Sequence, residues 1–171
     1  ISNVQVTDSD ATGGDTLIAK NSSTLSNTTN WCGDASYLSI SGDATMIAGG
    51  SNDITIRAYD AFNNIAVGYD GEKTLVFSGL SASPSGKNPT VENASGVDTD
   101  FEEATTTVFV DGVSASGNST LKAYKVESAT VSATDGEIDS EGHGLSLTVN
   151  PAVIDHFTVT GITDPQTAGT L

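Results

Sequence analysis

Residues 52–64, with the sequence NDITIRAYDAFNN, decide the fold of this chain. Ile54, Ile56 and Ala58 alternate with Thr, Arg and Tyr side chains, and a period of two predicts a strand with one buried and one solvated face. The last six letters, YDAFNN, are rich in polar residues that tolerate a tight turn. We therefore expect a strand over residues 53–59 that ends in a sharp turn.

The same alternation recurs along the chain, and turn sequences such as GG, DG and SGN separate its occurrences. Thr favours strands, whereas Gly and Asn favour turns, so the composition agrees with this pattern. Nothing in the sequence shows a sustained helical period. Several short strands with such spacing predict an all-β sandwich. The expected strands are residues 37–41, 45–48, 53–59, 73–78, 105–110, 119–126, 128–133 and 145–149.

Alternate apolar positions in these strands give a candidate core. It consists of Ile54, Ile56, Leu75, Phe77, Val108, Val110, Leu121, Val131, Leu147 and Val149.

Two stretches do not fit the strand pattern. Residues 81–100 are rich in Ser, Pro, Asn and Gly, which predicts a long surface loop. Residues 135–144, DGEIDSEGHG, predict a second loop that carries four carboxylates.

The chain divides into three segments on its own sequence. Residues 1–37 form a polar N-terminal strand and loop segment, residues 38–156 form the regular module, and residues 157–171 stand apart. The last segment begins FTVTG and continues to AGT, which echoes LSISG and AGG near the start of the module, about 120 residues earlier. A repeated opening predicts the first strand of a following module, or a strand donated to another chain.

Two motifs connect the module to a known family. The sequences ITIRAYDAFNN and GYDG resemble the "A-x-D-x-x-G-N … G-Y-x-G" core of bacterial immunoglobulin-like repeats. Such repeats occur in tandem in surface proteins, including invasin- and intimin-type adhesins. The chain departs from the pattern at Asn63-Asn64, where Gly-Asn is usual, and in the insertion at 81–100. Over residues 38–156, the resemblance implies an immunoglobulin-like β-sandwich with additional terminal strands and a structural or adhesive role.

The charge excludes several classes of function. The chain has a formal net charge of −16 and six Lys and Arg residues, so it offers no basic patch for nucleic acid or for an anionic membrane. No window is apolar enough to span a bilayer. Such acidity suits a solvated surface in an extracellular, cell-surface location, and it also suits bound divalent cations. Cys32 is the single cysteine, so the chain forms no internal disulfide.

Calcium is the metal that the acidic turns favour, because it takes six to eight oxygen ligands and Asp-rich, Gly-containing turns supply them. The first candidates are Asp8, Asp10, Asp15, Asp135, Glu137 and Asp139. Further carboxylates lie at Asp98, Asp100, Glu102, Glu103 and Glu141. None has the full spacing of a helix-loop-helix calcium site, and a solvated acidic turn explains them equally. No other cofactor is expected.

Glycosylation and catalysis have weaker signals. Sequons occur at Asn21, Asn27, Asn93 and Asn118, all in predicted loops, although a chain this rich in Ser and Thr yields about three by chance. The two histidines, His143 and His156, lie outside any nucleophile motif, so we expect no enzyme activity.

The expected function is structural. We expect a module or subunit of an extracellular appendage or adhesin that joins copies of itself head to tail by strand addition, through Phe157, Val159 and Ile162. The alternative is a chain that ends one strand into a following repeat. A rival from another class is a module that binds carbohydrate or a host protein through residues 81–100. An exposed aromatic cluster beside those residues would favour this rival.

Overall fold

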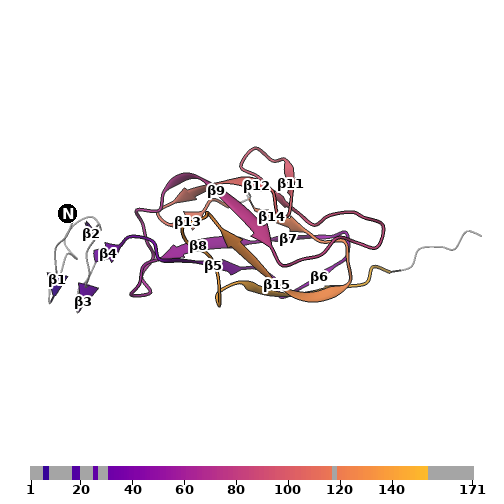
Figure 1. Cartoon of the computed structure of the whole chain (residues 1–171), viewed down its shortest axis with the longest axis horizontal. Coiled ribbons are helices and arrows are strands. Elements are labelled where there is room, and N and C mark those ends of the chain that lie inside the picture. Colours follow the sequence, from indigo (N-terminus) through magenta and orange to yellow (C-terminus); the bar gives the residue numbers. More distant parts are fainter. Residues whose placement is uncertain (1–5, 8–16, 20–24, 27–30, 117–118, 154–171) are drawn as a thin grey trace, which may run out of the picture.

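The computed structural model describes residues 6–7, 17–19, 25–26, 31–116 and 119–153 (Figure 1). Within these residues the chain is all β and has no helix. An eight-stranded sheet curls into a half-barrel, and a four-stranded antiparallel sheet accompanies it. The predicted all-β class is therefore confirmed.

The larger sheet contains β5 (Tyr37–Ser41), β6 (Thr45–Ile47), β8 (Thr55–Tyr59), β9 (Gly71–Ser78), β12 (Ala104–Val110), β13 (Val113–Ser114), β15 (Glu127–Thr134) and β16 (Leu145–Asn150). Their order across the sheet is β5-β8-β13-β12-β9-β15-β16-β6. All of these pairs are antiparallel except β16 with β6. Most of the predicted strands lie in this sheet, with bounds that differ by a residue or two.

The smaller sheet has the order β11-β10-β14-β7. Its strands are β7 (Ser51–Asp53), β10 (Thr90–Glu92), β11 (Asp98–Asp100) and β14 (Thr120–Lys122). Four short strands precede both sheets: β1 (Val6–Thr7), β2 (Leu17–Ala19), β3 (Leu25–Ser26) and β4 (Trp31–Gly33). They pair in parallel, β1 with β3 and β2 with β4.

The predicted strand over residues 53–59 is wrong in one respect, because the chain changes sheets within it. β7 belongs to the smaller sheet and β8 to the larger one, with Ile54 between them. The backbone N–H of Ile54 donates to the carbonyl of Ser119 at 3.0 Å, and its side chain is buried. Strands that pass between sheets form the corners of such folds, so this residue links two layers over one core.

All but two of the predicted core residues are buried. The exceptions lie on β12, where Val108 is half-buried and Val110 is 57% exposed. Thr105, Thr107 and Phe109 face the core instead. A shift of one residue exchanges the faces of a strand, and burial of a large aromatic ring outweighs burial of a valine. Phe109 therefore sets the register.

The predicted loop over residues 81–100 is also corrected. It contains the hairpin of β10 and β11, and β10 completes the smaller sheet by pairing with β14. Val91 is fully buried opposite Leu121, which explains why so polar a stretch is ordered as strands. The predicted strand 119–126 is shorter than expected, since β14 ends at Lys122.

Thr107 generates a stability prediction. Its hydroxyl is buried and finds no hydrogen-bond partner among the described residues, and an unpaired buried hydroxyl costs free energy. Thr107→Val keeps the shape and removes the polar group, so we expect the free energy of unfolding to rise by about 1 kcal/mol in urea titrations. Thr105→Val is the matched control, because the Thr105 hydroxyl donates to the carbonyl of Glu103 at 3.4 Å. Equal effects of the two substitutions would contradict the prediction.

Candidate functional site

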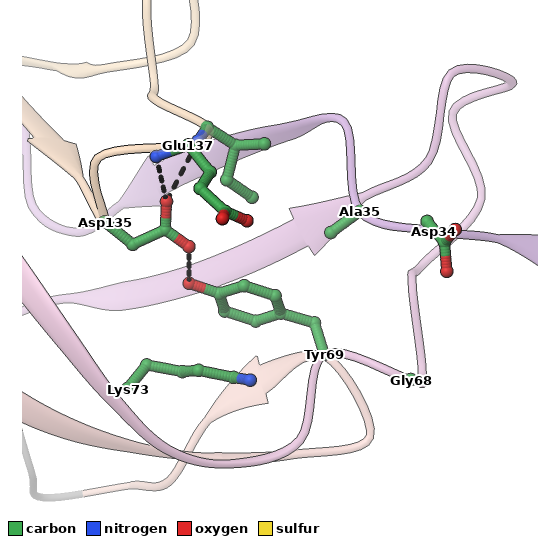
Figure 2. Close-up of a pocket in the computed structure, with 8 residues that line it drawn as sticks. Asp34, Ala35, Gly68, Tyr69, Lys73, Asp135 and Glu137 are labelled. Atoms are coloured by element: carbon green, nitrogen blue, oxygen red, sulfur yellow. Dashed lines mark hydrogen bonds between the residues drawn. The ribbon is translucent and has the colours of Figure 1, made fainter. Parts of the chain in front are cut away.

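The acidic loop at residues 135–144 borders a hollow of about 370 Å³ at the surface (Figure 2). Its walls come from three separate parts of the chain: the segment before β5, the turn before β9 and the loop after β15. The lining residues are Asp34, Ala35, Gly68, Tyr69, Lys73, Asp135, Glu137 and Ile138. The sequence signals the acidic loop, but it does not indicate that Tyr69 and Lys73 meet that loop.

Asp135 fixes the loop from within. One of its oxygens, Oδ1, accepts hydrogen bonds from the backbone N–H groups of Glu137 and Ile138, both at 2.9 Å. The other oxygen accepts the Tyr69 hydroxyl at 2.7 Å, as Figure 2 shows. The carboxylate therefore caps its own turn and ties it to the turn that precedes β9.

These contacts change the acidity of both groups. Burial works to raise the pKa of Asp135, but hydrogen bonds from Ile138, Glu137 and Tyr69 hold it below its ordinary value of 3.8. Burial raises the pKa of Tyr69 well above its ordinary value, and the hydrogen bond to Asp135 adds to the rise. At neutral pH this pair is thus a phenol that donates to a carboxylate.

The cationic side of the hollow is Lys73. Its ammonium lies 4.6 Å from the centre of the Tyr69 ring, within the range of a cation–π contact. The same ring packs against Phe109 in the core in a T-shaped arrangement, at 4.8 Å between ring centres. The lining residues include no Ser, Thr, Cys or His, so they do not form a Ser–His or Cys–His pair of nucleophile and base.

The predicted calcium carboxylates that the structure describes do not gather into one site. Within the residues that the structure describes, no three His, Cys, Asp or Glu side chains are arranged to hold a metal ion. Oδ1 of Asp139 accepts the N–H of Glu141 at 2.8 Å, and Asp98 forms a salt bridge with Lys122 at 2.7 Å. Asp8, Asp10 and Asp15 lie outside the described residues. Calcium binding stays a prediction.

His143 takes part in a row of rings. It stacks on Tyr37 at 4.3 Å between ring centres, and Tyr37 stacks on Tyr59 at 5.2 Å. Burial, followed by the proximity of Tyr59 and Asp60, raises the pKa of Tyr37. Because the rings cover one another, the row offers no broad aromatic platform. His156 lies outside the described residues.

The aromatic ring of Tyr124 lies next to residues 81–100, because it contacts Lys87. The Lys87 ammonium lies 3.8 Å from the centre of the Tyr124 ring and covers that face. The ligand-binding rival requires several exposed rings together, and the described aromatic contacts include no such group beside the hairpin. The ligand-binding alternative stays a prediction.

Of the four sequons, one is described. Asn93 is half-buried in the hairpin turn, where its Oδ1 accepts the N–H groups of Ser95 and Val97 at 2.9 and 3.1 Å. Asn21, Asn27 and Asn118 lie outside the described residues, as do the assembly residues Phe157, Val159 and Ile162. Glycosylation and strand assembly are not tested by these contacts.

The Asp135–Tyr69 pair predicts how stability depends on pH. A carboxylate whose pKa is lowered in the folded state contributes stability above its unfolded pKa, here about 3.8, and loses it as the pH falls through the folded value. Tyr69→Phe removes one stabilising bond, so we expect a loss of about 1 kcal/mol at pH 7 and a smaller loss near pH 2.

Urea unfolding at the two pH values measures this difference. Tyr124→Phe is the control, because its hydroxyl does not contact Asp135. A loss that is equal at both pH values would show that the Tyr69 hydroxyl acts independently of the carboxylate.

Calcium binding has a direct test in thermal unfolding. An ion that binds only the folded chain stabilises it by mass action. The prediction therefore requires the melting temperature to fall on chelation and to recover when calcium is restored. An identical transition in chelator and in calcium would reduce the acidic turns to a solvated surface.

Comparison with known proteins identifies no family. No family model matches the chain, and no curated protein matches it. Among solved structures, part of a glycosyl hydrolase family 2 (GH2) member from Bacteroides cellulosilyticus DSM 14838 is similar, with a TM-score of 0.40 and 17% sequence identity. The similarity covers 61% of this chain and 14% of that one. So distant a similarity transfers no function.

Proposed function

We propose that this chain is a structural module of an extracellular, cell-surface protein, and that its two sheets form an immunoglobulin-like sandwich of the kind found in tandem repeats. The observation that carries the proposal is the position of the chain ends of the module. Residues 31–36 enter at one end of its long axis, and residues 151–153 leave at the opposite end (Figure 1). Such a module extends a chain when it is repeated.

The sequence echo supports the same arrangement. β16 ends at Asn150, immediately before Pro151, and the pattern of β5 recurs at residues 157–161. A proline ends a strand because it has no N–H to donate to a ladder. In this proposal, one module therefore ends at Asn150, and residues 157–161 are the first strand of the next module.

Strand donation between chains is the second form of the proposal, with Phe157, Val159 and Ile162 as the donated side chains. In the module itself, β5 pairs with all five residues of β8, from Tyr37↔Tyr59 to Ser41↔Thr55. The N–H groups of Leu38 and Ile40 donate to the carbonyls of Asp139 and His143. The position of the opening strand is thus occupied, which favours continuation into a following module over donation to another chain.

The surface chemistry suits an exposed location. The net charge of −16 keeps neighbouring copies soluble, and its repulsion disfavours adventitious contact. Among the described residues, none forms a helix long and apolar enough to cross a lipid bilayer. The proposed partners are further modules of the same polypeptide, as the sequence echo indicates, and the acidic charge disfavours nucleic acid.

Deletion of residues 157–171 tests the two forms. Sedimentation velocity of the chain with and without this segment gives its state of association. We expect a monomer in both cases, because the segment belongs to a following module. Assembly of the intact chain that is lost on deletion would establish strand donation instead. Unfolding of the module on deletion would contradict the tandem form, since that form leaves residues 38–156 as a complete domain.

A further inference from the structure

The turn that follows β8 is built on one buried carboxylate. Asp60 is fully buried, and its Oδ1 accepts the backbone N–H groups of Phe62 and Asn64, both at 2.9 Å. Asn63 has a φ of 64°, in the left-handed region that Asn tolerates better than most residues. This explains why Asn replaces the glycine of the repeat pattern. One oxygen of Asp60 is enough to close the turn.

The second oxygen of Asp60 reaches beyond the turn. Oδ2 accepts the backbone N–H of Gly33 at 2.8 Å and the side-chain amide of Asn64 at 3.1 Å. Gly33 is the last residue of β4, in the segment that precedes the module. Among the described residues no salt bridge involves Asp60, and the donors found on its carboxylate are all amides. Loss of one donor from such a site is costly.

Two more contacts hold the same incoming segment. The N–H of Ser36 donates to the carbonyl of Tyr59 at 2.7 Å. The Tyr37 hydroxyl donates to the side-chain oxygen of Asn63 at 3.0 Å, and Ala35 packs against the core. Residues 33–36, which we call the leader, therefore lie on a surface formed by Tyr59 and the turn at 60–64, which we call the socket.

We propose that the socket is the joint between successive modules, and that it binds the exit segment of the preceding module in the same polypeptide. This inference rests on the proposed tandem arrangement. When the echo is aligned, Ala152 takes the place of Gly33 and Asp155 that of Ser36. Pro151 falls one position earlier, so the N–H that the carboxylate requires is retained.

The described exit segment agrees with this role. Pro151, Ala152 and Val153 are all exposed, and Val153 is exposed to 91%. Residues 151–153 leave the module at the end of its long axis opposite to residues 31–36 (Figure 1). Residues 151–153 are uncharged, so they bring no like charge to the carboxylate of Asp60. Because the leader is held by hydrogen bonds at both Gly33 and Ser36, the joint fixes direction, unlike a flexible linker.

Asp60→Asn tests the socket. Asn keeps one oxygen for the N–H groups of Phe62 and Asn64, but it turns an NH2 group toward Gly33, so that two donors face each other. We expect amide hydrogen exchange at Gly33 and Ser36 to accelerate at least tenfold, while the amides of β8 and β9 keep their protection. Asp98→Asn is the control, because Asp98 pairs with Lys122 outside the joint.

Unchanged exchange at Gly33 and Ser36 in Asp60→Asn would overturn the socket. If that variant fails to fold, Gly33→Pro removes the donor from the leader and leaves the module intact. Accelerated exchange at Ser36 then supports the socket, and exchange equal to that of the parent chain refutes it.

A transplant tests the tandem arrangement separately. Residues 31–36 are replaced by the sequence of residues 150–155, NPAVID. We expect the transplanted leader to be protected as the original is, and to lose protection in Asp60→Asn. The tandem assignment is refuted if the amides of the transplanted leader show no protection from hydrogen exchange. The socket itself still stands in that case, provided that Asp60→Asn accelerates exchange at Gly33 and Ser36 in the parent chain.

Discussion

The passage of the chain from one sheet to the other at Ile54 is the constraint on which this structure depends. β7 and β8 are consecutive in sequence and lie in different sheets, so the two layers cannot separate unless one of these strands leaves its sheet. The buried side chains of Ile56 and Leu121 come from opposite layers and meet over the core that this corner closes. Both the socket and the hollow take their positions from the strands that this corner orients.

Buried polar side chains also stabilise the fold, in addition to the apolar core. Asn52 is buried beside the corner, where its amide exchanges two hydrogen bonds with the backbone of Asp43, at 3.1 and 2.7 Å. Ser114 and Ser140 each accept a backbone N–H from a neighbouring strand, Ile56 and Ala133 respectively. In a sheet protein whose turns are polar, such side chains satisfy backbone donors that would otherwise lie unpaired.

The sequence predicted the class of fold and most of the core, because a period of two is read directly from neighbouring residues. It did not reveal the sheet change at Ile54, since alternation continues unbroken through a corner. On β12 it chose Val108 and Val110 over the threonines, because hydrophobicity alone favours valine, whereas Phe109 fixes the register.

The candidate site was only partly predictable for a related reason. The acidic loop stands out in the sequence, but its contact with Tyr69 joins residues 66 positions apart. Asp60 was visible within the repeat pattern, yet nothing local indicates that one of its oxygens binds Gly33, 27 positions earlier. The period of apolar residues predicts single strands, but it does not predict which strands and turns contact each other. Both sites form where segments that are distant in sequence come into contact.

The parallel pairing of β6 with β16 has a consequence for how the chain acquires its structure. Thr45 lies opposite Thr148. β6, one of the first strands of the module, therefore cannot pair until β16, the last strand, has formed. A topology dominated by distant pairings folds slowly, because the entropy of closing a long loop is lost before the contacts form. During synthesis, nearly the whole module must emerge before it closes. In a chain of similar repeats, that interval is when a strand from a neighbour competes for the same edge.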